Sequence, residues 1–474
     1  PLAAASRAAS GPERERYAEA YLGAVASFAS AHPGPYGIAW SSALELGLRV
    51  LSLVQGLPLV TQTEAFARAE TSVLRILDRH ARWLAADLSL DKVVRGNHLL
   101  GELSGLLAAG CLLPSARNEW WGECVVPSLL ETEVLRQFHE DGVSVEQSLT
   151  YEKFVLEVLT TAAELARLRG EPLVPVVETR LALAAWHLEI VTTPDGTLPL
   201  VGDCDSGRGI ADGEDPHRPA RSIARARRVF RSDVPSSGLG RYHFERGGHV
   251  VLAPREGDFL FVRGGPFGWG RPGPAAHSHA DWLAPVLNLD GEPILIDPGV
   301  FGYDVGSRLR NAFREWEAHN AIMPGAGRGP EPAGLFRWRG FDARADIALG
   351  EAWEVKGRVM WPHPPPLLWH RSIGYNQLHR GWRLEDRLEG AASGPVTCCM
   401  HLAPGIEVDA GKPGEFGLRL RSGKSFRLRL DPAVGTEIQK GWVAPAYGRR
   451  EPSLVLTYIL RPNQTGVVAD IVLP

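Results

Sequence analysis

Residues 277–299 read HSHADWLAPVLNLDGEPILIDPG. The Asp290-Gly291 pair lies between two apolar runs, and such a pair predicts a β-hairpin with a two-residue turn. The returning run ends at Asp297, which the hairpin carries back toward the histidines at the start of the stretch. From about residue 241 onward, short alternating or β-branched runs recur between turn residues, which is typical of an antiparallel β-sandwich.

The chain before this stretch has a helical pattern instead. From residue 12 to about 193, apolar residues recur at helical spacing, as at Leu44, Leu48 and Leu51. Short polar, Pro or Gly breaks separate the segments, so consecutive helices should pack antiparallel. Helices are expected at about 64–86, 97–112, 115–140, 146–169, 173–193 and 217–232.

These two patterns predict two domains. Residues 1–235 should form the helical domain, and residues 236–474 the β-sandwich. The boundary falls in the stretch SDVPSSG, which begins at Ser232 and has the composition of a linker. No third domain is expected.

The composition excludes several classes of protein. The 474 residues include 51 basic and 55 acidic side chains, so the net charge of −4 gives no electrostatic footprint for nucleic acid. No apolar run reaches about 18 residues, so no membrane span is expected. Five cysteines without a CxxC spacing do not imply structural disulfides. No signal peptide is visible at the beginning of the sequence.

The segment RGNHLLGE contains the first group of candidate site residues. Asn97 could cap a helix that begins here, and His98 and Glu102 would then lie on one side of it at i, i+4. Glycines at 101 and 105 would let a neighbouring helix approach closely. The alternative is an ordinary helix cap with one histidine in the core.

Tyr151 lies near the start of the helix expected at about 146–169, where it would share a face with Gln147. A phenol becomes a usable acid or base only when a cation or a desolvated pocket shifts its pKa. The alternative is a core tyrosine whose hydroxyl is hydrogen-bonded.

The HSHAD segment contains the third group. On a strand, His277, His279 and Asp281 would point to one face. Together with Asp297 and His319, such residues suit zinc or a similar borderline metal better than calcium, which prefers oxygen ligands. The alternative is a satisfied hydrogen-bond network. A metallo-β-lactamase-type site is disfavoured, because the residue after Asp281 is a tryptophan.

Isolated arginines form the fourth group. Arg208 follows the turn-rich stretch GDCDSG, and Arg314 lies in a short segment with Arg308 and Arg310. Most such arginines are solvated or pair with surface acids. A few could bind the carboxylate of a sugar bidentately.

Taken together, six segments resemble the heparinase II/III-like polysaccharide lyases, which include relatives acting on alginate. The resemblance implies an incomplete α/α toroid followed by an antiparallel β-sandwich. The toroid is expected to be shorter than usual, because extra helices do not precede the first segment. In chain order the segments are AWSSALELGLRVL (39–51), RGNHLLGELSGLLAAG (95–110), EQSLTYEKFVLEVL (146–159), GDCDSGR (202–208), residues 277–299, and RNAFREWEAHNAI (310–322).

The resemblance also implies a function. The chain would cleave an anionic polysaccharide or oligosaccharide that contains uronic acid, such as a glycosaminoglycan or alginate, by β-elimination. Asn97, helped by His98, would neutralise the uronate carboxylate. Tyr151 would be the acid, with Tyr151 or His98 as the base, and His277 would complete the site. Glu102, Gln147, Arg208 and Arg314 are candidate substrate contacts, and His279, Asp297 and His319 would bind a structural zinc or similar divalent metal.

Two other functions remain open at this level. The first is a catalytically silent protein that binds glycans, and the second is a zinc-dependent hydrolase centred on the HSHAD segment. The resemblance favours a periplasmic or secreted protein, and the sequence leaves the oligomeric state open.

Overall fold

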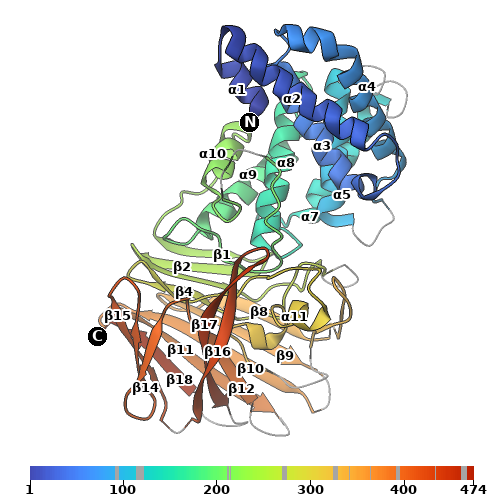
Figure 1. Ribbon diagram of the computed structural model, residues 1–474. Helices are drawn as coiled ribbons and strands as arrows, with labels where there is room; N and C mark the ends of the chain where they lie inside the picture. Colours follow the sequence, from blue (N-terminus) through green and yellow to red (C-terminus); the bar gives the residue numbers. More distant parts are fainter. Residues whose placement is uncertain are drawn as a thin grey trace.

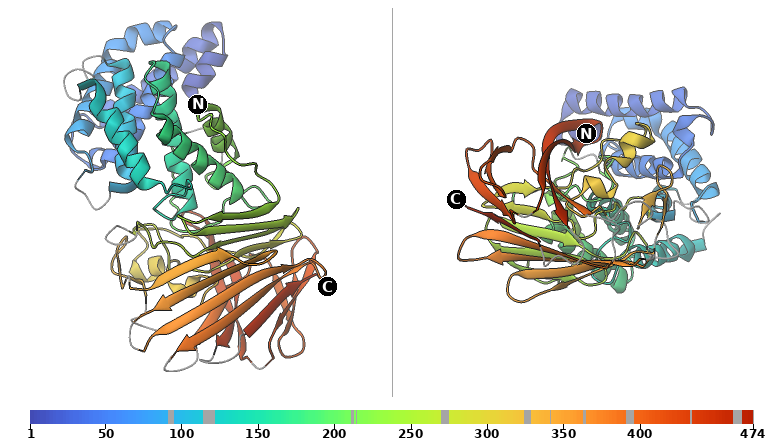
Figure 2. Two further views of the ribbon diagram at one scale, coloured as in Figure 1. Left: turned by 180° about the vertical axis from the view of Figure 1, so that it is seen from behind. Right: turned by 90° about the horizontal axis from the view of Figure 1, so that it is seen from below.

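The computed structural model describes residues 1–474 except 91–94, 114–121, 211–212, 214, 270–274, 324–328, 341, 363–364, 391–395, 433, 461–466 and 474. The helices form one part of the molecule and the strands form the other, with β1 and β2 lying between them (Figure 1). The same layering is visible from behind (Figure 2).

The helices agree with the pattern in the sequence to within a few residues at most ends. Ser148 caps α8, because its side chain accepts a hydrogen bond from the Tyr151 N–H, so this helix begins later than residue 146. Residues 115–121 of one expected helix lie outside the described residues. The described helices are α1 (Leu2–Ala8), α2 (Gly11–Ala31), α3 (Ala43–Gly56), α4 (Glu64–Ala86), α5 (Arg95–Leu112), α7 (Gly122–Gln137), α8 (Leu149–Leu168), α9 (Pro175–Ile190), α10 (Ala220–Val229) and the short α11 (Ser307–Asn311), with 3-10 turns at Ile38–Trp40, Leu57–Leu59 and Trp316–Ala318.

Helices α3 and α5 cross in direct backbone contact. A Cβ atom added at Gly47 would lie 2.6 Å from the carbonyl oxygen of Gly101, and one added at Gly105 would lie 2.6 Å from the Cα of Gly47. No larger residue fits these distances. The close approach expected from the glycines at 101 and 105 is therefore confirmed. It places the N-terminal ends of both helices on the wall of the cavity described below.

The strands pair antiparallel throughout the named ladders, in sheets of five, eight, three and two strands. The five-stranded sheet is β1 (Gly240–Phe244), β2 (His249–Arg255), β3 (Asp258–Arg263), β4 (Val286–Leu289) and β5 (Glu292–Leu295) in that order. The eight-stranded sheet has the order β13 (Glu407–Ala410), β14 (Glu415–Arg419), β15 (Ser425–Leu430), β18 (Val467–Val472), β11 (Gly381–Gly390), β10 (Leu367–Asn376), β9 (Glu354–Trp361) and β8 (Arg344–Leu349). The other two sheets are β12 (Val396–His401), β17 (Arg449–Leu460) and β16 (Thr436–Ala446), and β6 (Glu331–Pro332) with β7 (Trp338–Arg339).

The five-stranded sheet joins the two parts of the molecule. On one face, Val251 and Phe261 belong to the core of the helical part. On the other face, Val250 and Leu260 belong to the core of the sandwich. Alternation along β2 and β3 therefore provides an apolar surface to both neighbours, which explains why these strands are buried on both faces.

The predicted β4–β5 hairpin is confirmed. Asp290 and Gly291 have φ values of 53° and 83°, as a two-residue turn with both central residues left-handed requires. The prediction that residues 277–281 form a strand is wrong, because this stretch is irregular. Its backbone bonds instead to separate elements: the Asp203 N–H donates to the carbonyl of His277, and the Ala280 N–H donates to that of Arg314.

Two further findings concern the sequence-based exclusions. The described helices include none with both the length and the apolarity needed to span a bilayer. Among the described side chains, Cys204, Cys398 and Cys399 are buried free thiols.

Candidate active site

A cavity of about 530 Å³ lies at the junction of the helical part and the loops of the β part. Both parts contribute to its wall. From the helical part it is lined by Ser42, Leu44, Glu45, Leu48, Gly96, Asn97, His98, Glu146, Tyr151 and Phe154; from the loops that follow it is lined by Asp205, Gly207, Arg208, Trp269, Ala276, His277, Tyr303 and Phe336.

Asn97 is held against a buried carboxylate at the kinked start of α5. Its backbone N–H donates to Glu146 Oε1 at 2.9 Å, and its side-chain Nδ2 donates to both Glu146 oxygens at 3.1 Å. A Cβ atom at Gly96 would lie 2.0 Å from Glu146 Oε1, so the glycine makes room for this carboxylate. Asn97 Oδ1 has no hydrogen-bond partner among the described residues, so the expected capping role is not seen. The Nδ2 also lies 3.3 Å from His277 Nε2.

The Tyr151 hydroxyl lies at the centre of a polar cluster. It donates to Asp205 Oδ2 at 3.1 Å and lies 3.0 Å from the Tyr303 hydroxyl. Its ring stacks on His277, with the ring centroids 3.9 Å apart. Burial, and then the charge of Asp205, raise the pKa of Tyr151 well above its ordinary value. Tyr151 therefore keeps its proton in the free protein.

Asp203 orients the imidazole that contacts Tyr151. This buried carboxylate accepts hydrogen bonds from His277 Nδ1 at 3.2 Å, His279 Nε2 at 3.0 Å and Arg310 Nη2 at 2.6 Å. Although burial opposes its charge, Arg310 and the two histidines hold the pKa of Asp203 well below its usual range. Because Nδ1 of His277 donates to this carboxylate, its Nε2 can face the cavity as a hydrogen-bond acceptor. Burial lowers the pKa of His277, but the hydrogen bond with Asp203 and the charge of Glu146 outweigh burial, so the pKa is raised.

Two more of the predicted residues also line the cavity. His98 is half-buried on the first turn of α5, next to Asn97. Arg208 is exposed and makes no ion pair with a described residue, so its guanidinium remains available to an anionic ligand. The structure thus brings together Asn97, His98, Tyr151, His277 and Arg208.

Three predicted substrate contacts lie outside the cavity. Glu102 accepts hydrogen bonds from the N–H and the hydroxyl of Ser89, at 2.7 and 2.6 Å, within the helical core. Arg314 is buried and donates to Asn311 and to the carbonyls of Gly334 and Leu335. It therefore anchors the loop that carries Phe336 to the cavity wall.

Gln147 is the third predicted substrate contact that lies outside the cavity. It precedes α8 instead of sharing a helical face with Tyr151, and its φ is 55°. Its side chain bonds to His249 Nε2 at 3.2 Å, and His249 in turn contacts His187 at 3.0 Å. His187 pairs with Glu152 at 2.8 Å. This buried chain joins α8 and α9 to β2, so Gln147 holds the two parts of the molecule together.

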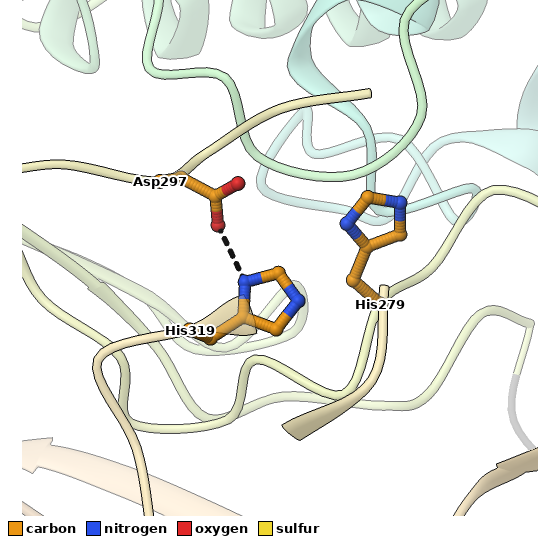
Figure 3. Close-up of side chains that lie close together, drawn as sticks. All are labelled: His279, Asp297 and His319. Carbon is orange, nitrogen blue, oxygen red and sulfur yellow. Dashed lines mark hydrogen bonds and ion pairs between the residues drawn. The ribbon is translucent and has the colours of Figure 1, made fainter. Parts of the chain in front are cut away.

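The predicted metal ligands are close together. His279, Asp297 and His319 can place one ligand atom each within 4.8 Å of one another, and all three are buried (Figure 3). His319 Nδ1 bonds to Asp297 Oδ2 at 2.9 Å. His279 Nδ1 and His319 Nε2 have no hydrogen-bond partner among the described residues. None of the three lines the cavity. Asp281 pairs instead with the buried Arg263.

Several site residues were not singled out from the sequence. Asp203 and Asp205 stand at i, i+2 in the turn-rich GDCDSG stretch, where the paired carboxylates were the available signal. Glu146 opens the EQSLTY segment, and its contact with Asn97 spans 49 positions. Tyr303 and Phe336 lie in irregular segments without any distinctive spacing, so only the fold could place them.

Comparisons with known proteins cover nearly the whole chain. Residues 1–210 match a family model described as the heparinase II/III N-terminus. Residues 238–468 match one described as heparinase II/III-like, C-terminal. A search of curated proteins found no match.

Solved structures with the same architecture exist. A heparinase III structure aligns with a TM-score of 0.77 at 18% identity, covering 100% of this chain and 75% of that one. A mutant of the heparan sulfate lyase HepC from Pedobacter heparinus aligns with a TM-score of 0.71 at 19% identity, covering 97% and 73%. The predicted fold class, an incomplete toroid followed by an antiparallel β-sandwich, is therefore confirmed.

Proposed function

Because the chain belongs to the heparinase II/III-like family of polysaccharide lyases, we propose that it cleaves a uronic-acid-containing glycan by β-elimination. The bond from C4 to the leaving O4 would break after loss of the C5 proton, leaving an unsaturated uronate. One observation carries this proposal: Asn97, His98, Tyr151 and His277 surround a single cavity. A protein that only binds glycans has no need for this set.

The first requirement is to neutralise the uronate carboxylate, because the C5 proton is otherwise too weakly acidic. Glu146 fixes the Asn97 amide so that an N–H also points toward His277. A carboxylate bound beside Asn97 would accept this N–H in place of His277 Nε2 and share its charge with the donors around it. His98 and the available Arg208 are the nearby groups that would assist.

The second requirement is an acid and a base. Tyr151 holds its proton, which suits the acid that protonates O4. A phenol in that state does not suit the base, so the C5 proton would pass to an imidazole. Among the described residues of the cavity wall, the imidazoles are those of His277, which Asp203 orients, and His98.

The test is incubation of the purified protein with heparan sulfate, hyaluronan and alginate, followed by ultraviolet absorbance and reducing-end assays. A lyase produces the absorbance of the C4–C5 double bond together with each new reducing end. New reducing ends without that absorbance would show a hydrolase. If the protein bound a polymer but formed no products from it, it would be a silent binding protein.

We also propose a structural metal. Two buried imidazole nitrogens have no partner among the described residues, and with one carboxylate they form a mixed donor set that fits zinc, whereas calcium would require more oxygen ligands. Bound there, the metal would join the loop of His279, two residues from His277, to Asp297 and His319. None of its three ligands lines the cavity, which favours this structural role over a zinc hydrolase.

Removing a metal ligand should therefore destabilise the protein. Elemental analysis of the wild type should find about one equivalent of zinc or a similar metal, and His319→Ala should lose most of it. Its melting temperature should fall by several degrees, because the loops lose their common ligand. The matched control is His370→Ala, a half-buried histidine on β10 outside the three ligands, which should keep its metal. A wild type without any bound transition metal would contradict this proposal.

A further inference from the structure

A second hollow lies on the β part. Its volume is about 670 Å³, and β16 and β17 form one side of it. These two strands form a long hairpin that rises from the sandwich to the level of β1 and β2 at the junction (Figure 1). We call this hollow the hairpin groove. Its lining includes Thr397, Cys399, His401, Thr436, Gln439, Lys440, Trp442, Arg450 and Thr457.

The tip of the hairpin contacts the wall of the cavity directly. The Tyr447 hydroxyl accepts a hydrogen bond from the backbone N–H of Tyr303 at 2.9 Å, and the two rings lie 5.3 Å apart. The backbone N–H of Tyr447 donates to Ser206 Oγ at 3.3 Å. Ser206 lies between the cavity residues Asp205 and Gly207. Tyr447 is 40% exposed, so an aromatic surface continues from the cavity onto the hairpin.

Further along the hairpin, a tryptophan lies at the edge of the groove. Trp442 is 45% exposed, which is unusual for so large an apolar side chain. The Arg450 guanidinium lies 4.4 Å from its ring centroid and 5.4 Å from that of Phe301. Trp442 stands four residues before Ala446, the last residue of β16, or about 13 Å along an extended strand.

The charges in the groove allow an anionic ligand. Arg450 and Lys440 make no ion pair with a described residue, although both are exposed. Glu317 and Glu437 also line the groove, so it has no excess of positive charge overall. Such a mixture does not attract a dense polyanion. It suits a chain that carries spaced carboxylates and many hydroxyl groups.

One buried side chain in the groove has a ring nitrogen without a hydrogen-bond partner among the described residues. His401 is only 6% exposed, and its Nε2 donates to the carbonyl of Glu317 at 2.9 Å. Its Nδ1 is therefore an acceptor, and it has no hydrogen-bond partner among the described residues. A buried acceptor without a partner destabilises a protein unless a ligand or water satisfies it. A hydroxyl group on a bound ligand would do so.

We infer that the hairpin groove binds the continuation of the same uronate-containing saccharide chain that occupies the cavity. Tyr447 and Trp442 stack on sugar rings, as amphipathic aromatic side chains do. Arg450, held over Trp442, binds a carboxylate. This inference rests on the proposed function for the identity of the chain in the cavity. It makes the protein a binder of long substrates, several sugar units of which contact the β part.

The experiment compares Trp442→Ala and Arg450→Gln with the wild type on whichever of heparan sulfate, hyaluronan and alginate is cleaved. KM for the polymer should rise roughly fivefold in each variant, with the effect in KM and not in kcat. The increase should shrink as the substrate is shortened to the smallest oligosaccharide cleaved. Trp442→Phe should keep part of the affinity. The matched control is Leu378→Ala, which changes a 91% exposed residue in the β10–β11 turn.

A binding assay separates this inference from the proposed function. The Tyr151→Phe protein, with and without Trp442→Ala, is run through gels that contain each polymer. Retardation that Trp442→Ala weakens supports the groove, even if no polymer in the panel is cleaved. Equal retardation of the two proteins, or an unchanged KM for the polymer in both single variants, would overturn the inference while leaving the lyase activity standing.

Discussion

Tyr151→Phe should lower kcat on the cleaved polymer about 10³-fold, within the range that general acid catalysis supplies. Burial raises the pKa of this phenol, and its hydroxyl contacts the Asp205 carboxylate and the hydroxyl of Tyr303. Phenylalanine keeps the ring that stacks on His277, so the cavity should hold its shape. The loss should therefore appear in kcat, with little change in KM.

The control for this substitution is Tyr242→Phe. Tyr242 donates its hydroxyl to the carbonyl of Gly238, away from the cavity, so its loss removes a comparable group without touching the site. Initial rates from ultraviolet absorbance measure both variants. A Tyr151→Phe protein that keeps more than about a tenth of the wild-type kcat would remove Tyr151 from the role of acid.

Asp203→Asn should cause the second large effect, on stability as well as on activity. The substitution leaves the fully buried Arg310 without its carboxylate, which in comparable buried pairs costs about 3 to 5 kcal/mol. For a domain of this size that corresponds to a fall in melting temperature of roughly 10 °C. Activity should fall about 10²-fold or more, because an amide no longer selects the His277 tautomer with its proton on Nδ1.

Thermal denaturation followed by circular dichroism measures the first effect, and initial rates below the new melting temperature measure the second. Asp346→Asn provides the control, since this exposed carboxylate pairs with Arg358 at the surface and its loss should leave the melting temperature unchanged. If the Asp203→Asn protein had the melting temperature of the wild type and kept its activity, Asp203 would not be the residue that organises the site.

The sequence predicted most of the fold because its signals are local. Helical periodicity predicted α4 at its observed ends, and the Asp290-Gly291 pair gave the β4–β5 hairpin. Small residues at 101 and 105 indicated the close helix crossing, and the structure added its partner, Gly47. Each of these patterns depends on neighbours within a few positions.

The site was predicted less completely because its contacts are long-range. Alternation suggested that the HSHAD segment is a strand, but the backbone of this segment bonds to residues near 203 and 314. Glu102 shares a helix with His98 and would have pointed to the same space, yet Ser89, 13 positions away, turned out to be its partner. Spacing along a helix gives the direction of a side chain, and it does not give the element that lies there.

The cavity wall combines residues from distant parts of the chain, and this has a consequence for biosynthesis. Asn97 and Tyr151 leave the ribosome long before His277 and Tyr303, and the tip of the β16–β17 hairpin at Tyr447 comes later still. A nascent helical domain can fold first, as N-terminal domains generally do, but it then lacks the part of the wall that His277, Tyr303 and Phe336 provide. The proposed site is therefore incomplete until the segment that carries Tyr447 has been synthesised, so the order of synthesis itself delays the appearance of the proposed activity.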